Sequence, residues 1–263
     1  MKKIGLLLSG LCMSVVFLTS CLKGNSIWEG DLYGVISFNG FRYLFVSSSG
    51  SFYSPNLEDI YINGQNCYKI HCKIDAGAPE NSYRVVQANG YMKMTYINHE
   101  RIPDFEISYS SQGNSSYMLA NEVPISKVSE GYDYSSGYLF LKQLINIPDD
   151  WELNWIMNYD PATFTPSENS IYYNLYVRVT AISSEKTQNN SRTCYNAYNM
   201  RNMLSDAANN EKEKLGTAFN ETSKITLKIN YVSSVDETSN TVSWSYELVE
   251  IPLLFILMFE ASY

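Results

Sequence analysis

Chemistry that depends on histidine has few candidate residues in this chain, because His71 and His99 are its only histidines. His99 lies in a segment that we interpret as a solvated turn, and a metal site that joined His71 to Cys67 would lack two further ligands. The chain has no Gly-x-Ser-x-Gly elbow, no His-Glu-x-x-His helix and no phosphate-binding glycine loop. We therefore predict a protein that is not an enzyme, with no catalytic residue, no metal and no cofactor.

One acidic pair invites comparison with glycosidases, because Asp149 and Asp150 lie beside Trp151 and Trp155. Sugar hydrolysis needs two carboxylates on opposite sides of the scissile bond. Adjacent residues on a strand or turn point away from each other. We interpret the pair as the rim of a loop that supports the tryptophan strand.

The start of the chain has the pattern of a lipoprotein signal. Lys2 and Lys3 precede an apolar run, and Leu18-Thr19-Ser20-Cys21 has the form of a lipobox, with small residues directly before a cysteine. We predict a signal peptide over residues 1–20 and lipidation at Cys21.

After the lipobox, residues 21–26 form a short lipidated tether. The several acyl chains of a lipoprotein cysteine hold a protein at a bilayer in effect permanently. We therefore expect a protein anchored to the outer membrane by lipid, with the membrane as a partner. Leu22–Asn25 contains no acidic cluster, so the periplasmic and the surface face both stay open. The formal net charge of -8 gives no support to a nucleic-acid partner.

Alternation with a period of two dominates the rest of the chain. Apolar side chains alternate with polar ones over Tyr68–Ile74, Trp151–Asn158, Ile225–Tyr231 and Val242–Leu248, which is typical of half-buried antiparallel strands. Asn39-Gly40 between two apolar runs predicts a hairpin. Further strands are expected at Leu32–Phe38, Phe41–Ser47, Tyr83–Ala88, Tyr91–Ile97, Tyr138–Ile145 and Ile171–Ile182, with Asn89-Gly90 as another hairpin turn.

The fold class is therefore all-β. Apolar residues that recur three and four positions apart over Asn199–Leu215 predict one short helix in the second half of the chain. Ser, Asn and Gly accumulate after Tyr109, where we place a domain boundary. Residues 27–110 suit a five-stranded OB-like barrel, and residues 111–263 suit an antiparallel β-sandwich.

Three cysteines remain after the lipidated one, namely Cys67, Cys72 and Cys194. An odd number excludes a complete disulfide framework. Cys67 and Cys72 project to opposite faces of one strand, so a bridge between them is geometrically poor. We favour free thiols, with a bridge from Cys194 to either of the others as the alternative.

Aromatic residues make up 14% of the chain, including 22 Tyr. Strands and sandwich cores accommodate most of them. Several are nevertheless expected in loops or on both strand faces, where exposed Tyr with Asn and Ser is typical of protein- or glycan-binding surfaces. The candidate ligand-binding residues are Tyr132, Tyr134, Trp151, Trp155 and Tyr172. A protein that acts by binding is thus our main hypothesis, with a glycan-binding surface lipoprotein as an alternative.

The end of the chain leaves a second alternative open. Residues 251–259 are almost continuously apolar but too few to span a bilayer. Such a run indicates a strand that is buried in its own domain or donated to another chain. We favour burial, whereas donation would make the protein a pilus-like or fimbrillin-type surface subunit.

The motifs of the first half follow a recognisable order. The lipobox precedes Gly30–Ile36, Phe41–Val46, Ser54-Pro55-Asn56 and Ile62–Gln65, which lead into the strand from Tyr68. This order resembles that of the NigD-like lipoproteins of Bacteroides-type bacteria. The resemblance implies an OB-like first domain, a β-sandwich second domain and no established enzymatic activity.

The lipobox makes a direct prediction. We expect the Cys21→Ala precursor to escape the lipoprotein peptidase and to carry no lipid, because the thiol that accepts the acyl group is gone. Metabolic labelling with a radioactive fatty acid measures this, with the unaltered chain as the control. Persistent label on Cys21→Ala would contradict the prediction.

Overall fold

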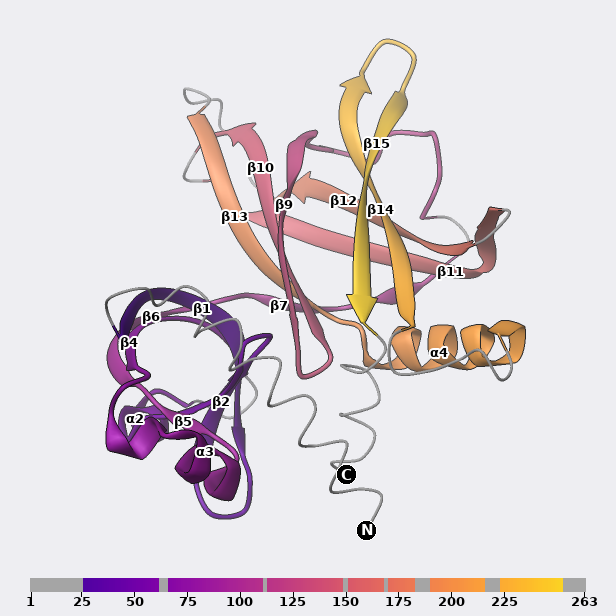
Figure 1. Cartoon of the computed structure of the whole chain (residues 1–263). Helices are drawn as coiled ribbons and strands as arrows, with labels where there is room; N and C mark the ends of the chain where they lie inside the picture. Colours follow the sequence, from indigo (N-terminus) through magenta and orange to yellow (C-terminus); the bar gives the residue numbers. More distant parts are fainter. Residues whose placement is uncertain are drawn as a thin grey trace. The chain divides into compact units, whose positions relative to one another are not determined.

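The computed structural model describes residues 26–61, 66–110, 113–148, 151–167, 170–182, 190–215 and 223–252 (Figure 1). Four features of the sequence analysis lie outside these residues, namely the lipobox, Ile62–Gln65, Asp149-Asp150 and the apolar tail after Pro252. Within the described residues, no helix is long and apolar enough to cross a membrane.

The chain forms two compact units. The first runs to Pro103 and includes Asp133–Ser136, and the second comprises Asp104–Tyr132 and the chain from Gly137 onward. The boundary falls a few residues before the one that we placed after residue 110. The reason is that two short strands, β7 (Asp104–Glu106) and β8 (Ser108–Tyr109), pair with strands of the second unit.

The first unit is a barrel-like sheet as expected, but it has six strands where we expected the five of an OB-like barrel. Its strands pair in the order β5-β3-β2-β1-β4-β6. Only Met94 separates β5 from β6, yet β5 pairs with β3 and β6 pairs with β4, so this one stretch of chain closes the sheet on itself. The bounds are β1 Ile27–Phe38, β2 Tyr43–Ser47, β3 Gly50–Tyr53, α2 Asn56–Ile60, β4 Cys67–Asp75, η1 Pro79–Asn81, α3 Tyr83–Asn89, β5 Met92–Lys93 and β6 Thr95–Arg101.

The barrel core follows from the alternation along β4. Tyr68, Ile70, Cys72 and Ile74 are all fully or almost fully buried, as predicted, and they pack with residues of the neighbouring strands such as Phe45. Each large apolar side chain that is removed from water stabilises the unit by about 1.5–3 kcal/mol. The period-two pattern therefore sets both the strand and its inward face.

A glycine allows β1 to serve two partners. At Gly34 the strand pairs with Tyr68 of β4 and with Ser47 of β2. A Cβ atom at this position would lie 2.1 Å from the carbonyl oxygen of Val46. Any side chain would push β2 away, so the bend of the barrel depends on glycine here.

The expected strand Tyr83–Ala88 is wrong, because the segment forms helix α3. Val86 is the one buried residue of α3. The segment therefore faces the core at a single position and lacks the alternating buried positions of the strand that we expected. Gly90 has φ 75° and its N–H donates to the Val86 carbonyl. Asn89-Gly90 is therefore the end of a helix, since a left-handed glycine suits that position as well as it suits a hairpin.

The second unit is a β-sandwich with two sheets. Their strand orders are β7-β13-β10-β9 and β15-β14-β12-β11-β8. Three pairs are parallel, namely β11 with β8, β12 with β14 and β13 with β7, so the sandwich is mixed instead of purely antiparallel. The remaining bounds are β9 Ile125–Ser135, β10 Tyr138–Ile147, β11 Leu153–Ser167, β12 Ser170–Ala181, β13 Asn190–Asn199, β14 Lys224–Asp236 and β15 Thr241–Pro252.

The predicted helix is confirmed as α4, Arg201–Leu215, which is drawn at one end of the sandwich (Figure 1). Met203, Leu204 and Ala207 on one of its faces are buried. The hydroxyl of Tyr173 on β12 donates to the Ala207 carbonyl at 3.1 Å. The helix thus covers the core, as its apolar spacing predicted.

The three cysteines of the described residues are free, as we favoured. Cys67 and Cys72 are buried and Cys194 is half-buried. Burial, with a smaller contribution from the charge of Asp31, raises the pKa of Cys72 to about 12. Such a thiol stays protonated and unreactive at neutral pH.

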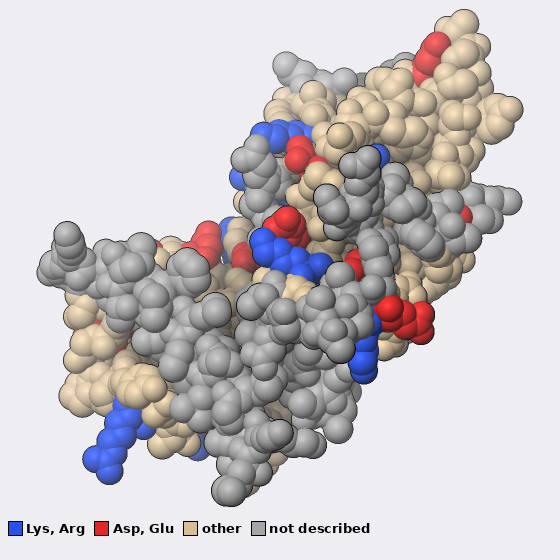
Figure 2. All heavy atoms as spheres, turned by 45° about the vertical axis from the view of Figure 1, so that its right-hand side comes forward, with Lys and Arg blue, Asp and Glu red and all other residues tan. Residues whose placement is uncertain are grey.

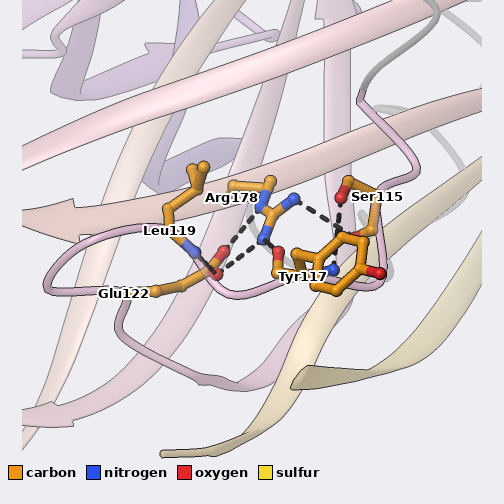
Figure 3. Close-up of polar contacts among 5 residues, drawn as sticks. All are labelled: Ser115, Tyr117, Leu119, Glu122 and Arg178. Atoms are coloured by element: carbon orange, nitrogen blue, oxygen red, sulfur yellow. Dashed lines mark hydrogen bonds and ion pairs between the residues drawn. The ribbon is translucent and has the colours of Figure 1, made fainter. Parts of the chain in front are cut away.

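One buried ion pair fixes the loop that precedes β9 onto the outer face of the larger sheet (Figure 3). Arg178 of β12 donates from Nε and Nη2 to the two carboxylate oxygens of Glu122, each at 2.6 Å. The guanidinium also donates to the carbonyls of Tyr117 at 2.6 Å and Ser115 at 3.3 Å. Glu122 Oε2 in turn accepts the Leu119 N–H at 2.8 Å.

The two side chains are 3% and 0% exposed, so neither charge has water as a substitute partner. Removing one partner of a buried, hydrogen-bonded pair leaves an uncompensated charge, which costs about 3–5 kcal/mol. The bidentate geometry fixes the loop in one position as well as compensating the charges.

We predict that Glu122→Ala lowers the free energy of unfolding of the second unit by about 3–5 kcal/mol. The matched control is Glu250→Ala, which removes the carboxylate of the exposed Lys224–Glu250 pair, where about 0–1 kcal/mol is expected. Urea denaturation followed by circular dichroism measures both. Equal losses for the two variants would contradict a structural role for the buried pair.

Candidate functional site

The five candidate ligand-binding residues do not form one exposed patch. Tyr134 and Trp155 are only 6% and 7% exposed, which argues against their contacting a ligand. Trp151 and Tyr172 are half-buried, and the side chain of Tyr132 lies outside the described residues.

Two of the candidates, Trp155 and Tyr172, are also far apart on the sheet. Trp155 on β11 lies opposite Val179 of β12, whereas Tyr172 comes seven residues earlier on that strand. At about 3.3 Å per residue the two positions are about 23 Å apart. The aromatic composition correctly suggested exposed rings but did not indicate which ones.

The most exposed large apolar side chain of the described residues is at the tip of the β1–β2 hairpin. Phe41 is 89% exposed, and Phe38 at the base of the same turn is 57% exposed. The Asn39-Gly40 signal had predicted this hairpin, and β1 does pair with β2 up to Phe38 and Tyr43. The connection has four residues, two more than the tightest hairpins.

Hydrogen bonds to the side chain of Asn39, which belongs to the turn, order the tip. Asn39 Oδ1 accepts the N–H groups of Phe41 at 3.1 Å and Arg42 at 3.0 Å. The Asn39 N–H donates to the Arg42 carbonyl at 3.1 Å, and Gly40 has φ 92°. Phe41 is therefore held out on a preformed turn.

Rings continue from the tip along the end of the barrel. The ring of Tyr43 lies 5.1 Å from that of Phe38 and 4.7 Å from that of Tyr61, measured between centroids. Both distances fall in the range that favours aromatic pairs. The tip and these three rings form one surface, which we call the hairpin surface: Phe38, Phe41, Tyr43 and Tyr61.

Arg42 attaches the hairpin to the rest of the barrel. Its guanidinium lies over the rings of Tyr53 and Tyr91, at 5.1 and 5.2 Å from their centroids, and it donates to the Tyr91 hydroxyl. Tyr91 lies between α3 and β5, so the arginine joins the first hairpin to the connection between β4 and β5. Cation–π contacts of this kind contribute about 0.5–2 kcal/mol each.

A polar groove is the other notable surface feature of the barrel. It encloses about 500 Å³ and is lined by Asp31, Lys69, His71, Asn98, His99 and Glu100. His99 lies on β6 and its Nδ1 contacts the Tyr96 hydroxyl at 2.8 Å, so it is part of a strand and not of the turn that we expected.

The charges in and beside this groove compensate one another. His71 Nδ1 lies 2.7 Å from Asp31 Oδ1, and Lys69 Nζ lies 3.4 Å from Glu100 Oε2. Hydrogen bonding from Lys73, and less so from His71, lowers the pKa of Glu29. Among the residues that the structure describes, no cluster of three His, Cys, Asp or Glu side chains could hold a metal. Exposed pairs of this type contribute little to stability.

Comparison with known proteins places the fold. No family model and no curated protein matches the chain. An uncharacterized protein from Parabacteroides merdae ATCC 43184 has TM-score 0.72 at 16% identity, with 85% of this chain and 99% of that chain covered. A predicted lipoprotein from Bacteroides fragilis NCTC 9343 has TM-score 0.52 at 13% identity, with 86% and 98% covered.

A third structure, a predicted toxin-related protein from Parabacteroides distasonis ATCC 8503, has TM-score 0.52 at 13% identity and covers 90% of this chain and 98% of its own. All three neighbours come from Bacteroides-type bacteria and match both units of the chain. The two-domain β fold that the resemblance implied is thus shared with solved proteins of these bacteria.

The hairpin surface makes a prediction about stability. Phe41→Ala should change the free energy of unfolding by no more than about 0.5 kcal/mol, because its ring is almost wholly in water. Phe45→Ala, three residues beyond the turn in β2, should cost about 3–5 kcal/mol because that ring is 0% exposed. Thermal or urea unfolding of both variants decides this. A large loss for Phe41→Ala would show that the tip serves the fold instead of a partner.

Proposed function

We propose that this chain is a non-enzymatic lipoprotein of the cell envelope that binds a protein partner through the hairpin surface. Cys21 would attach it to the outer membrane. The lipobox supports the anchor, as does the fold shared with a predicted lipoprotein of Bacteroides fragilis. The observation that supports binding most directly is the 89% exposure of Phe41 on an ordered turn.

An exposed phenylalanine contributes almost nothing to folding but can contribute much to association. Burying such a ring in a partner's pocket stabilises a complex by about 1.5–3 kcal/mol. The Asn39 hydrogen bonds already hold the turn, so little conformational entropy is lost on binding. Interface centres are enriched in aromatic residues and arginine, which are the types gathered around Arg42.

The position of the tip relative to the anchor suits this function. The tether over residues 22–26 can reach at most about 20 Å from the lipid. The tether joins the barrel at Ile27, the first residue of the 12-residue strand β1. The turn of the β1–β2 hairpin follows Phe38, the last residue of that strand. The two ends of such a strand lie up to about 36 Å apart. The hairpin surface therefore begins at the opposite end of β1 from the attachment point.

Charge favours a protein over a nucleic acid. The formal net charge is -8. Figure 2 shows Lys and Arg scattered among Asp and Glu on the visible face, without a continuous basic patch among the described residues. Phosphate-backbone binding depends on many clustered cations.

Site-specific photo-crosslinking in the cells that make the protein tests the proposal. With p-benzoylphenylalanine in place of Phe41, we expect an adduct with one envelope protein after irradiation. The control places the same probe at Ile97, which is on β6 of the same unit and is 41% exposed. The absence of an adduct at position 41, or equal adducts at both positions, would refute binding through the hairpin surface.

A further inference from the structure

The outer face of the sandwich's larger sheet presents a second group of aromatic and apolar side chains, on the neighbouring strands β12, β14 and β15 (Figure 1). Tyr246 is 56% exposed and Leu248 is 48% exposed. Trp244 and Tyr176 are half-buried, and their rings meet edge to face with centroids 5.5 Å apart. We call this set, together with Lys228, the sheet platform.

Strand register explains why these side chains share one face. Tyr246 lies opposite Asn230 of β14, and Leu248 lies opposite Lys228. Tyr176 of β12 pairs with the same Asn230 from the other side. Directly opposed residues in a sheet point to the same face, so three neighbouring strands contribute to one surface.

The Arg178–Glu122 pair forms one boundary of the platform. The Arg178 guanidinium lies 5.5 Å from the ring centroid of Trp244, while its hydrogen bonds hold the loop that covers the neighbouring part of the same face. The loop itself pairs with β15 at Tyr117 and Thr241. Trp244 of β15 thus packs against a guanidinium that its own hydrogen bonds hold in place, which is the preorganisation that binding sites on strands provide.

Lys228 is the cation of the sheet platform. Lys228 Nζ lies 4.3 Å from the ring centroid of Tyr246, and the residues opposite and beside it, Leu248 and Asn174, bear no charge. The acid further along the same face, Glu250, pairs with Lys224. The site therefore combines aromatic planes with a cation that has no carboxylate among its register neighbours.

We infer that the sheet platform binds an acidic polysaccharide, one whose sugars bear carboxylates. The flat C–H faces of sugar rings stack on aromatic side chains such as Tyr246, and a uronate carboxylate matches Lys228 beside Tyr246 in charge. This site lies in the second unit and is independent of the hairpin surface on the barrel.

Isothermal titration of the full mature chain in detergent tests the inference. The probes are hexasaccharides of galacturonate, mannuronate and hyaluronan, with neutral cellohexaose as the matched control. We expect at least one acidic hexasaccharide to bind, to bind more weakly as salt is raised, and to bind more tightly than cellohexaose.

Variants assign the binding to residues. Tyr246→Ala and Lys228→Ala should each lower the affinity at least about tenfold, whereas Tyr246→Phe and Lys228→Arg should retain most of it. Tyr109→Ala is the control, because Tyr109 is 49% exposed at the opposite edge of the same sheet. Circular dichroism confirms that each variant is folded.

Three results would overturn the inference. They are the absence of binding by all three acidic probes at millimolar concentration, equal binding of cellohexaose, and an affinity that Tyr246→Ala and Lys228→Ala leave unchanged.

Discussion

The buried contact between Arg178 and Glu122 is the constraint on which the second unit depends most. A guanidinium and a carboxylate that are almost wholly removed from water must satisfy each other, and here they do so through two hydrogen bonds of 2.6 Å. The same arginine binds two loop carbonyls and lies over Trp244. One side chain therefore couples a loop without regular structure, a central strand and the aromatic outer face.

The first unit achieves rigidity by different means. Gly34 lets β1 approach β2 and β4 together, and the adjacent strands β5 and β6 close the barrel. Arg42 then holds the hairpin against Tyr53 and Tyr91. The result is an apolar ring displayed on a fixed turn. Both units thus present aromatic side chains on supports whose order does not depend on a ligand, which lowers the entropic cost of binding.

Sequence patterns predicted most of this fold because strand alternation, helical spacing and Asn-Gly turn pairs are local signals. The buried face of β4, the β1–β2 hairpin and helix α4 all follow from them. These signals gave a wrong prediction where one residue pattern occurs in two kinds of local structure. Asn89-Gly90 ends a helix instead of turning a hairpin, because left-handed glycine serves both. Strands β9 and β13 were not anticipated, since β13 in particular is rich in Asn, Ser and Thr.

The binding surfaces were harder to predict, because exposure depends on contacts between distant segments. Trp155 and Tyr134 were candidates by composition, yet tertiary packing buries them. Phe41 was part of an expected strand, and only the four-residue turn shows that its ring is free of the core. Glu122 and Arg178 are 56 residues apart in the chain, so no short motif could have paired them.

Hydrogen–deuterium exchange on the lipidated protein tests most directly whether the hairpin surface is occupied by a partner. Exchange of the Phe41 and Arg42 amides would be compared between intact envelopes and the purified protein in detergent, with the exposed turn at Asp236–Ser239 as the internal reference. The account predicts slower exchange at the hairpin in envelopes and no change at the reference turn. Identical exchange at the hairpin in both preparations would contradict it.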